Sequence, residues 1–294
     1  METIKLKGLF ILLILFSRVG LSQDNFIYPE IIDLKADNKC SCSDFMIKHL
    51  TDSIKKELDS PYKGIIEIRK VDLNFDSKCE IMLIYEDREA YPNYTPFKLF
   101  KIDNNTITEI GFFFKEYVSF ANKSNDYLQI LSRHYEGQKT NPIYYLQVYR
   151  FDGKSYKLLE TPNLTRGQYM DLGSQSYNLK KYEDAERYYF NAYIMSKAFQ
   201  INQIIDANNL ALVWIKQKKY DKSKSILLET ISILKDGYYN KKELAPVYYN
   251  LGLIAESKNN YKDALDSYQM SYSYEPSDAR MIKINLMKEK INGR

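Results

Sequence analysis

Oxygen-bearing side chains stand at alternate positions in one short segment of the first half of the chain, Asp72-Leu-Asn74-Phe-Asp76-Ser-Lys-Cys-Glu80. Such oxygens are the ligands that Ca²⁺ prefers, and the ion takes about six to eight of them. The segment therefore supplies candidate metal ligands in Asp72, Asn74, Asp76 and Glu80. The alternative interpretation is a strand-connecting turn, because Asp and Asn side chains hydrogen-bond readily to nearby backbone groups.

The segment resembles the aspartate-rich loops of β-propeller repeats of the FG-GAP and VCBS type, in which such loops bind calcium. The resemblance covers about 15 residues and departs from the family pattern in the turn itself. Phe75 and Ser77 stand where the family has glycines, and Lys78 brings a positive charge close. The chain is too short for a full propeller, so the resemblance implies at most one or two blade-like units.

Three cysteines lie in the same half of the chain: Cys40, Cys42 and Cys79. We expect Cys79 to pair with Cys40 or with Cys42, because two cysteines one residue apart rarely pair with each other. The alternative is that all three stay reduced. Three cysteines without a C-x-x-C motif, together with the chain's two histidines, do not make a zinc site.

The residues needed for an enzyme are scarce. We expect His49 on the polar side of a helix and His134 at the end of a strand, which leaves little for general acid–base catalysis. Ser53-Ile-Lys-Lys56 matches S-x-x-K, but the companion motifs are absent. Nucleotide-binding, zinc-protease and G-x-S-x-G motifs are absent too. We therefore expect no enzyme and no cofactor.

An α+β domain is predicted over residues 23–160, with a leading helix and an antiparallel meander. Apolar residues at helical spacing predict the helix over Ser43–Leu58. The predicted strands are Gly64–Val71, Cys79–Tyr85, Pro96–Ile102, Thr106–Phe113, Tyr127–His134, Ile143–Phe151 and Tyr156–Leu159. The last two flank Asp152-Gly153, a hairpin turn signal.

The second half repeats one pattern three times: a Leu-Gly or Leu-Ala pair, then a tyrosine, a small residue and a large apolar residue. The copies are Leu172-Gly173, Tyr182, Ala185 and Tyr189; Leu210-Ala211, Tyr220, Ser223 and Leu227; and Leu251-Gly252, Tyr261, Ala264 and Tyr268. Such recurrence is the signature of stacked helical hairpins. In the third copy we expect helices over Leu244–Ser257 and Tyr261–Tyr274, the second stopped by Pro276.

This pattern resembles the tetratricopeptide repeat, and the resemblance covers about residues 165–276. It implies an all-α superhelix of three hairpins over residues 161–294, with small residues where paired helices cross. The family period is about 34 residues, whereas Gly173 to Ala211 spans 38 residues and Ala211 to Gly252 spans 41. We expect the added residues to lengthen helices by about one and two turns, with loop residues near Asp236-Gly237 taking up any remainder.

In the family, the first helix of each hairpin lines a concave groove that binds partners. The matching residues are Met170, Ser174, Tyr177, Asn208, Leu212, Ile215, Tyr249, Leu253 and Glu256. They are mostly apolar. Some members hold a peptide carboxylate with a clamp of Lys, Asn and Arg at these places, but this chain has Met170 and Ser174, then Asn208 and Leu212, so that clamp is missing. The groove could hold an amphipathic helix or an extended apolar peptide, or it could be filled by the chain's own sheet domain or last helix.

A final amphipathic segment, Asp278 to Ile291, is expected to cap the open end of the stack. The alternative is a helix that binds a partner.

Residues 1–22 have the form of a secretory signal: a basic start, an apolar run over Gly8–Phe16, and small residues before cleavage near Ser22-Gln23. We expect an exported protein, periplasmic or extracellular, without membrane insertion after cleavage. Removal of this segment lowers the net charge from +4 to about +2. That near-neutral balance argues against a nucleic-acid partner.

These features favour a non-catalytic scaffold that binds a protein or peptide, in a bacterial envelope assembly. The alternative is a ligand- or calcium-responsive sensor in the sheet domain, with the repeats as its output.

Overall fold

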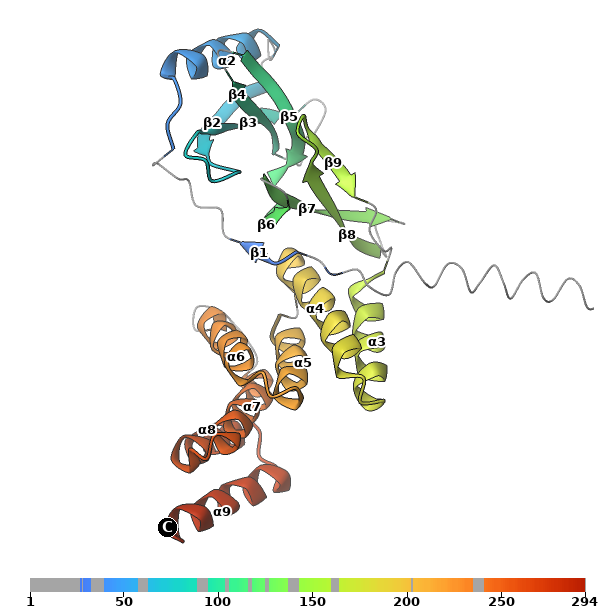
Figure 1. The fold of residues 1–294 in the computed structure, drawn as a ribbon, viewed down its shortest axis with the longest axis vertical. Coiled ribbons are helices and arrows are strands. Elements are labelled where there is room, and N and C mark those ends of the chain that lie inside the picture. Colours follow the sequence, from blue (N-terminus) through green and yellow to red (C-terminus); the bar gives the residue numbers. More distant parts are fainter. Residues whose placement is uncertain are drawn as a thin grey trace, which may run out of the picture. The chain divides into compact units, whose positions relative to one another are not determined.

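The computed structural model describes residues 27, 29–32, 40–57, 63–88, 95–103, 106–115, 118–124, 127–136, 143–159, 164–201, 203–234 and 241–293. The chain divides into two compact units, residues 1–163 and 164–294 (Figure 1). The predicted signal segment and the loop near Asp236-Gly237 lie outside the described residues, as does the His134 side chain. Within the described part, no helix combines the length and apolarity needed to cross a bilayer.

The first unit combines one described helix with two antiparallel sheets. Its elements are β1 (Ile31–Ile32), α2 (Asp44–Glu57), β2 (Lys63–Val71), β3 (Glu80–Asp87), β4 (Pro96–Asp103), β5 (Thr106–Phe114), β6 (Val118–Ser124), β7 (Tyr127–Glu136), β8 (Ile143–Phe151) and β9 (Tyr156–Leu159). One sheet has the order β2-β3-β4-β5 and the other β1-β6-β7-β8-β9.

Helix α2 covers one face of the four-stranded sheet. Leu50 and Ile54, one turn apart, are buried against Ile81, Leu83 and Phe100 of the strands. This is the apolar stripe that the sequence predicts for the leading helix.

The opposite face of the four-stranded sheet packs against the five-stranded sheet. Their shared core contains Leu99 and Phe113 from one sheet with Ile130 and Tyr156 from the other. The rings of Phe113 and Tyr156 meet edge to face, with centroids 6.0 Å apart. The unit is therefore built in three layers: helix, sheet and sheet.

The strands form two successive meanders where the sequence analysis expected one. Alternating apolar residues tell which face of a strand is buried, but not which neighbour it pairs with. Strands β1 and β6 were not predicted. The first has two residues, and the second ends in the polar run Asn122-Lys123-Ser124. The β1 strand joins its sheet through β6, where Ile31 pairs with Ala121.

The second unit is helical: α3 (Arg166–Asn178), α4 (Tyr182–Phe199), α5 (Gln203–Lys216), α6 (Tyr220–Leu234), the 3₁₀ turn η2 (Lys241–Glu243), α7 (Leu244–Ser257), α8 (Tyr261–Tyr274) and α9 (Asp278–Asn292). Capping residues set several of the starts. Thr165 and Gln168 form a capping box at α3, and Ser277 caps α9. Helices α7 and α8 have the bounds that the third copy predicts.

A longer helix explains why Gly173 and Ala211 are 38 residues apart, and not about 34 as in the family period. Helix α4 has 18 residues where α8 has 14, so the four added residues make about one further turn. Helix α6 has 15 residues. The two added turns expected for the second copy are thus not present in the described part of α6, and η2 precedes α7 instead.

Candidate interaction surface

Paired helices of the first and third hairpins cross at a glycine that lies against a tyrosine ring. A Cβ atom on Gly173 would lie 2.7 Å from the Tyr189 ring, and one on Gly252 would lie 2.5 Å from the Tyr268 ring. Tyr268 is fully buried and its hydroxyl donates to Glu256 at 2.7 Å. These crossings are the close approaches that the repeat pattern predicts.

The second hairpin makes the same crossing with other residues. Ala211 replaces the glycine, and the smaller Leu227 replaces the tyrosine; both are fully buried. Ser223, at the small-residue position, donates its hydroxyl to the Ala211 carbonyl at 2.9 Å. The chain thus pairs Gly with Tyr and Ala with Leu, which keeps the volume at the crossing nearly constant.

The glycine–tyrosine crossing leads to a prediction. Gly252→Ala should lower the free energy of unfolding by about 1–3 kcal/mol, because the added methyl group overlaps a buried ring. This outcome is opposite to helix propensity, which favours Ala over Gly by about 1 kcal/mol. Chemical denaturation followed by circular dichroism checks it.

Two controls separate the crossing from a general effect of the substitution. Gly167→Ala in α3 should be neutral or stabilising, since the nearest atom to its Cβ would be 3.9 Å away. Adding Tyr268→Leu to Gly252→Ala copies the second hairpin and should recover part of the loss. A destabilising Gly167→Ala, or a double variant less stable than the additive sum, would contradict this account.

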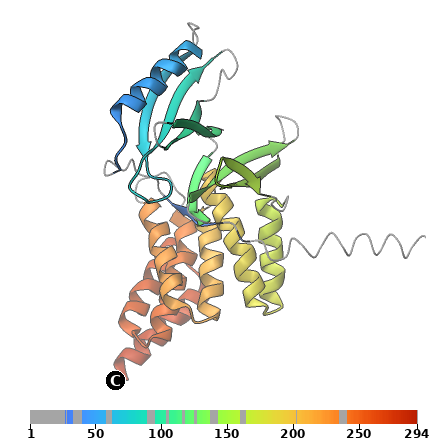
Figure 2. The same ribbon diagram turned by 45° about the horizontal axis from the view of Figure 1, so that its top comes forward.

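Polar contacts join neighbouring hairpins. Arg166 of α3 binds the fully buried carboxylate of Asp206 in α5 through two hydrogen bonds of 2.7 Å. Ser196 of α4 donates to the same carboxylate. Further along the stack, the Asn250 side-chain amide in α7 donates to the Asn208 side-chain oxygen in α5 at 2.8 Å. The first helices α3, α5 and α7 are therefore linked in series, and Figure 2 shows the stack of helices.

A glutamate bridges the first two hairpins as well. Glu186 of α4 accepts from the Trp214 indole N–H at 2.7 Å and from the Lys219 ammonium at 2.6 Å. Burial opposes ionisation of this carboxyl group, but these donors hold its pKa below the ordinary value. Glu186 therefore remains charged and holds the two hairpins together at neutral pH.

Helices α3 and α5 leave the predicted groove residues partly accessible. Met170, Tyr177, Leu212 and Ile215 are half-buried, and Ser174 is exposed. Asn208 is half-buried and engaged by Asn250. These residues follow helical spacing along one face of each helix.

Ile205 extends the same face of α5 and was missed in the sequence analysis. It lies three residues before Asn208 and seven before Leu212, and its side chain is 44% exposed. Its helical spacing from those two residues was the signal that could have found it.

The predicted groove residues of α7 serve a different role. Tyr249 and Leu253 pack against the cluster that contains Ile284 and Met287 of α9. Glu256 accepts from Lys283 at 2.8 Å and from Lys290 at 3.4 Å, both in α9. The last helix therefore engages Glu256 directly, while Tyr249 and Leu253 pack within the cluster that α8 and α9 share. These α7 residues thus have partners within the chain.

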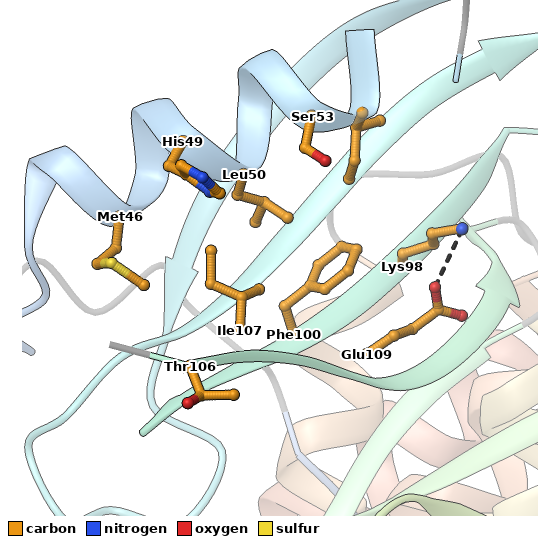
Figure 3. A pocket seen from close by; sticks show the side chains of 10 residues that line it. Met46, His49, Leu50, Ser53, Lys98, Phe100, Thr106, Ile107 and Glu109 are labelled. Atoms are coloured by element: carbon orange, nitrogen blue, oxygen red, sulfur yellow. Dashed lines mark ion pairs between the residues drawn. The ribbon is translucent and has the colours of Figure 1, made fainter. Parts of the chain in front are cut away.

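In the first unit, a pocket of about 410 Å³ lies between α2 and the strands β4 and β5 (Figure 3). Leu50, Ile54 and Phe100 give it an apolar floor. Lys98 and Glu109 on its rim form an ion pair of 3.0 Å. His49 and Ser53 also line it, and no hydrogen bond joins these two among the described residues.

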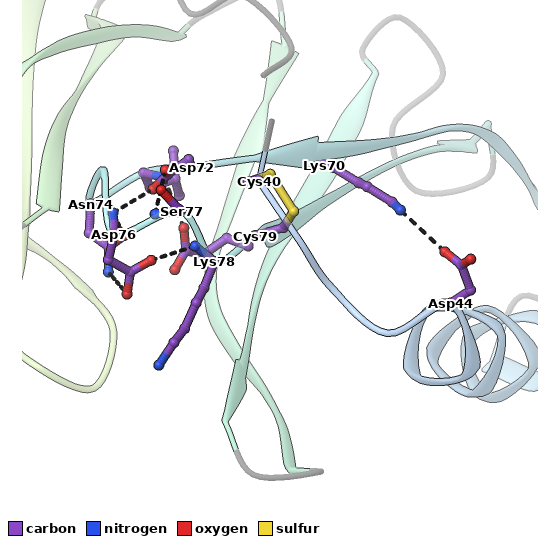
Figure 4. Close-up of a disulfide and its surroundings, with 11 residues drawn as sticks. Cys40, Asp44, Lys70, Asp72, Asn74, Asp76, Ser77, Lys78 and Cys79 are labelled. Carbon is purple, nitrogen blue, oxygen red and sulfur yellow. Dashed lines mark hydrogen bonds and ion pairs between the residues drawn. A yellow bond between two sulfur atoms is a disulfide. The ribbon is translucent and has the colours of Figure 1, made fainter. Parts of the chain in front are cut away.

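The predicted metal loop uses its oxygens on its own backbone (Figure 4). Asp72 accepts from the backbone N–H groups of Asp76 and Ser77 at 3.1 and 2.9 Å. Asn74 accepts from Asp76 N–H, and Asp76 from Lys78 N–H at 2.8 Å. No group of three or more His, Cys, Asp or Glu side chains in the described segments is placed to hold a metal. The arrangement is that of a self-bonded turn.

Phe75 and Ser77 adopt the left-handed conformation in this turn, with φ of 61° and 67°. These are the two positions at which the resembled calcium loops have glycine, so the backbone follows a glycine-type path without glycine. Glu80 has different hydrogen-bond partners from the other candidate ligands. Its two oxygens accept from Leu73 N–H at 2.8 Å and from the Tyr127 hydroxyl at 3.0 Å.

The buried position of Glu80 leads to a pH prediction. Burial raises its pKa from 4.5 to about 6, so between these pH values the folded chain holds a proton that the unfolded chain has released. Stability therefore falls as pH rises through this window, by about 2 kcal/mol in total. Denaturant unfolding of the parent and of Glu80→Gln at pH 4.5 and pH 7 measures the difference. A parent-minus-variant difference that stays constant or rises with pH would contradict the assignment.

A disulfide joins Cys40 to Cys79, and Cys42 is a free thiol. The backbone of the intervening Ser41 holds the two segments together: its N–H donates to Ser77 at 3.0 Å and its carbonyl accepts from Cys79 at 3.3 Å. Burial raises the pKa of the Cys42 thiol above its ordinary value. Cys42 is therefore mostly protonated and a weak nucleophile at neutral pH.

Comparison with known proteins finds no matching protein-family model. An uncharacterized protein, ycf37 of Cyanophora paradoxa, is 34% identical over 83 residues, which is 28% of this chain and 46% of that protein. The chain thus spans about half the length of this curated relative.

Solved structures similar to the chain are tetratricopeptide domains. The TPR2AB domain of yeast Sti1, in a pHSP90 complex, is 15% identical with a TM-score of 0.40, over 44% of this chain and 48% of that one. The Arabidopsis OM64 TPR domain is 16% identical with a TM-score of 0.35, over 42% and 94%. The N-terminal domain of STI-1 from C. elegans is 20% identical with a TM-score of 0.34, over 42% and 94%. The helix bounds and glycine–tyrosine crossings described above confirm the predicted stack of helical hairpins. The FG-GAP resemblance stays a prediction.

Proposed function

We propose that this chain is a non-catalytic, exported interaction protein that binds an apolar segment of another protein on the inner face of α3 and α5. We define this inner face by Met170, Ser174, Tyr177, Ile205, Asn208, Leu212 and Ile215. The observation that carries the proposal is the accessible apolar stripe on α5, where Ile205 is 44% exposed and Leu212 and Ile215 are half-buried.

The composition of the inner face supports an apolar partner. It holds no charged residue, so it lacks the cations that would recognise an acidic peptide or a terminal carboxylate. An amphipathic helix or an extended apolar peptide would bury the stripe and leave its polar side in water. Engagement of Glu256 by α9, and packing of Tyr249 and Leu253 on the cluster that α8 and α9 share, support a groove that ends at α5.

The rigid links between hairpins support a preformed surface. Asp206 ties α5 to α3 and α4, and Asn208 ties it to α7. A partner would therefore meet helices already held in place, which lowers the entropic cost of binding.

The disulfide supports export. Disulfides form and persist in oxidising compartments and are rare in the reducing cytosol. Together with the signal-like residues 1–22, the Cys40–Cys79 bond favours the periplasm or the extracellular space, and a scaffold role in a bacterial envelope assembly.

A pull-down with matched variants tests the proposal. Ile205→Asp places a charge on the inner face, and Leu228→Asp places the same charge on α6, where Leu228 is 47% exposed. Both changes should leave stability within about 0.5 kcal/mol of the parent. We expect the parent and the Leu228→Asp variant to capture a partner protein. The Ile205→Asp variant should fail to capture it. Equal retention by all three proteins would show that the inner face is not the binding surface.

A further inference from the structure

The three turns that join the paired helices have one geometry. Lys180, Lys218 and Asn259 all adopt the left-handed conformation, with φ of 60°, 61° and 57°. The backbone N–H of the next residue donates to a carbonyl five residues earlier in each case, at 2.9, 2.8 and 2.9 Å. Since equivalent turns of stacked hairpins lie along one edge, we name residues 179–184, 216–222 and 258–263 the turn edge.

The turn edge is basic. It contains eight lysines and four carboxylates, whereas the whole chain has a net charge of +4. Lys219 is paired with Glu186 and Lys258 with Asp221. Within the described part of the chain, the side chains of Lys180, Lys181, Lys216 and Lys218 form no ion pair or hydrogen bond, and their charges face solvent.

The left-handed lysines are not required by the turns themselves. Asn259 makes the same turn in the third hairpin, and asparagine tolerates this conformation better than lysine does. A lysine in the left-handed conformation strains the backbone more than an asparagine would. The presence of lysine at such a position therefore points to a role for its side chain. In this chain, the two lysines place a positive charge at the tip of each of two successive turns.

An apolar side chain stands among these charges. Leu179 is 67% exposed and directly precedes Lys180 and Lys181. Lys180 and Lys181 also line a cavity of about 650 Å³, together with Lys219, Tyr182, Glu183, Asp184 and Gln217. Asp184 is paired with Arg187 at 3.0 Å and Lys219 with Glu186 at 2.6 Å. The lysines Lys180 and Lys181 and the glutamate Glu183 therefore set the charge around the opening.

We propose that the turn edge adsorbs to an anionic phospholipid surface. Its lysines would face lipid phosphates, and Leu179 would enter the headgroup layer, as in other peripheral membrane contacts. The charges are spread along successive turns, and the first of these turns carries the exposed Leu179. This arrangement fits a broad surface better than a single acidic peptide.

Vesicle co-sedimentation tests this proposal independently of the inner face. All proteins begin at Gln23, which keeps every described residue and leaves out the apolar run Gly8–Phe16, because that run would itself enter vesicles. The vesicles contain phosphatidylglycerol in phosphatidylcholine, or phosphatidylcholine alone. We expect the parent to bind only the anionic vesicles, and 0.5 M NaCl to weaken binding, because salt screens exposed charges.

Two triple variants carry the same change in charge. The variant K180E/K181E/K218E should lose on the order of tenfold or more in partition to anionic vesicles. The matched control K154E/K157E/K288E reverses three exposed lysines elsewhere and should bind like the parent. Leu179→Ser should weaken binding with no change in charge, and Ile205→Asp should leave it unchanged.

Three results would overturn the proposal. They are failure of the parent to sediment with anionic vesicles, equal loss in both triple variants, and full competition by soluble polyglutamate at matched charge. The last result would assign the turn edge to an acidic protein segment instead.

Discussion

Asp206→Ala should destabilise the second unit by about 3–5 kcal/mol. The Asp206 side chain is fully buried, while that of Arg166 is 21% exposed. Loss of the carboxylate would leave the guanidinium and the buried Ser196 hydroxyl without their main acceptor. It would also release the contact that holds α3, α4 and α5 together. Urea unfolding followed by far-ultraviolet circular dichroism measures the effect.

Asp221→Ala is the matched control, because it removes an ion pair of the same 2.7 Å length from the surface. The Asp221 side chain is 94% exposed, so solvent screens its ion pair and its loss should have little effect on stability. Arg166→Met combined with Asp206→Leu should recover much of the loss by replacing the polar cluster with apolar packing. Similar costs for Asp206→Ala and Asp221→Ala would show that the buried cluster does not hold the hairpins together.

Loss of the disulfide should have the second large effect, in the first unit. Cys79→Ser should lower the free energy of unfolding by about 2–4 kcal/mol, because the bond closes a loop between residues 39 positions apart and restricts the unfolded chain. Cys79 is the informative position, since removal of Cys40 would leave Cys42 free to pair with it. Thermal unfolding with and without a reducing agent measures the change.

Cys42→Ser is the control for this prediction. Its thiol lies outside the bond, so the variant should stay within about 0.5 kcal/mol of the parent. Reduction should bring the parent to the stability of Cys79→Ser and leave that variant unchanged. A loss in Cys42→Ser as large as that in Cys79→Ser would mean that the pairing is not the one described.

The repeat could be predicted from sequence because its contacts are local and recur. The residues that meet at a crossing, Gly252 and Tyr268, are 16 positions apart, and the same spacing joins Gly173 to Tyr189. The extra turn in α4 could be predicted too, since four added residues preserve the packing face of a helix.

The polar clusters could not be predicted, because their members are far apart in the sequence. Asp206 meets Arg166 across 40 positions, and Glu80 meets Tyr127 across 47. A carboxylate within an apolar stretch of sequence predicts that a donor group pairs with it, but the sequence does not identify which residue supplies that donor. The use of Glu256 by α9 was hidden for the same reason, because Lys283 lies 27 positions downstream.

The division of the strands into two sheets could not be predicted from the sequence either. Strand β5 ends at Phe114 and β6 begins at Val118, a spacing as short as that within a meander. The apolar pattern is the same whether the chain turns back into the same sheet or starts the next one.

Photo-crosslinking from the inner face tests the central claim most directly. A photoreactive amino acid in place of Ile205 would report on α5, and one in place of Leu228 would report on an equally exposed position of α6. In cells that export the chain, we predict a specific crosslinked partner from position 205 and none from position 228. Equal adducts from both positions, or adducts from 228 alone, would contradict binding at the inner face of α3 and α5.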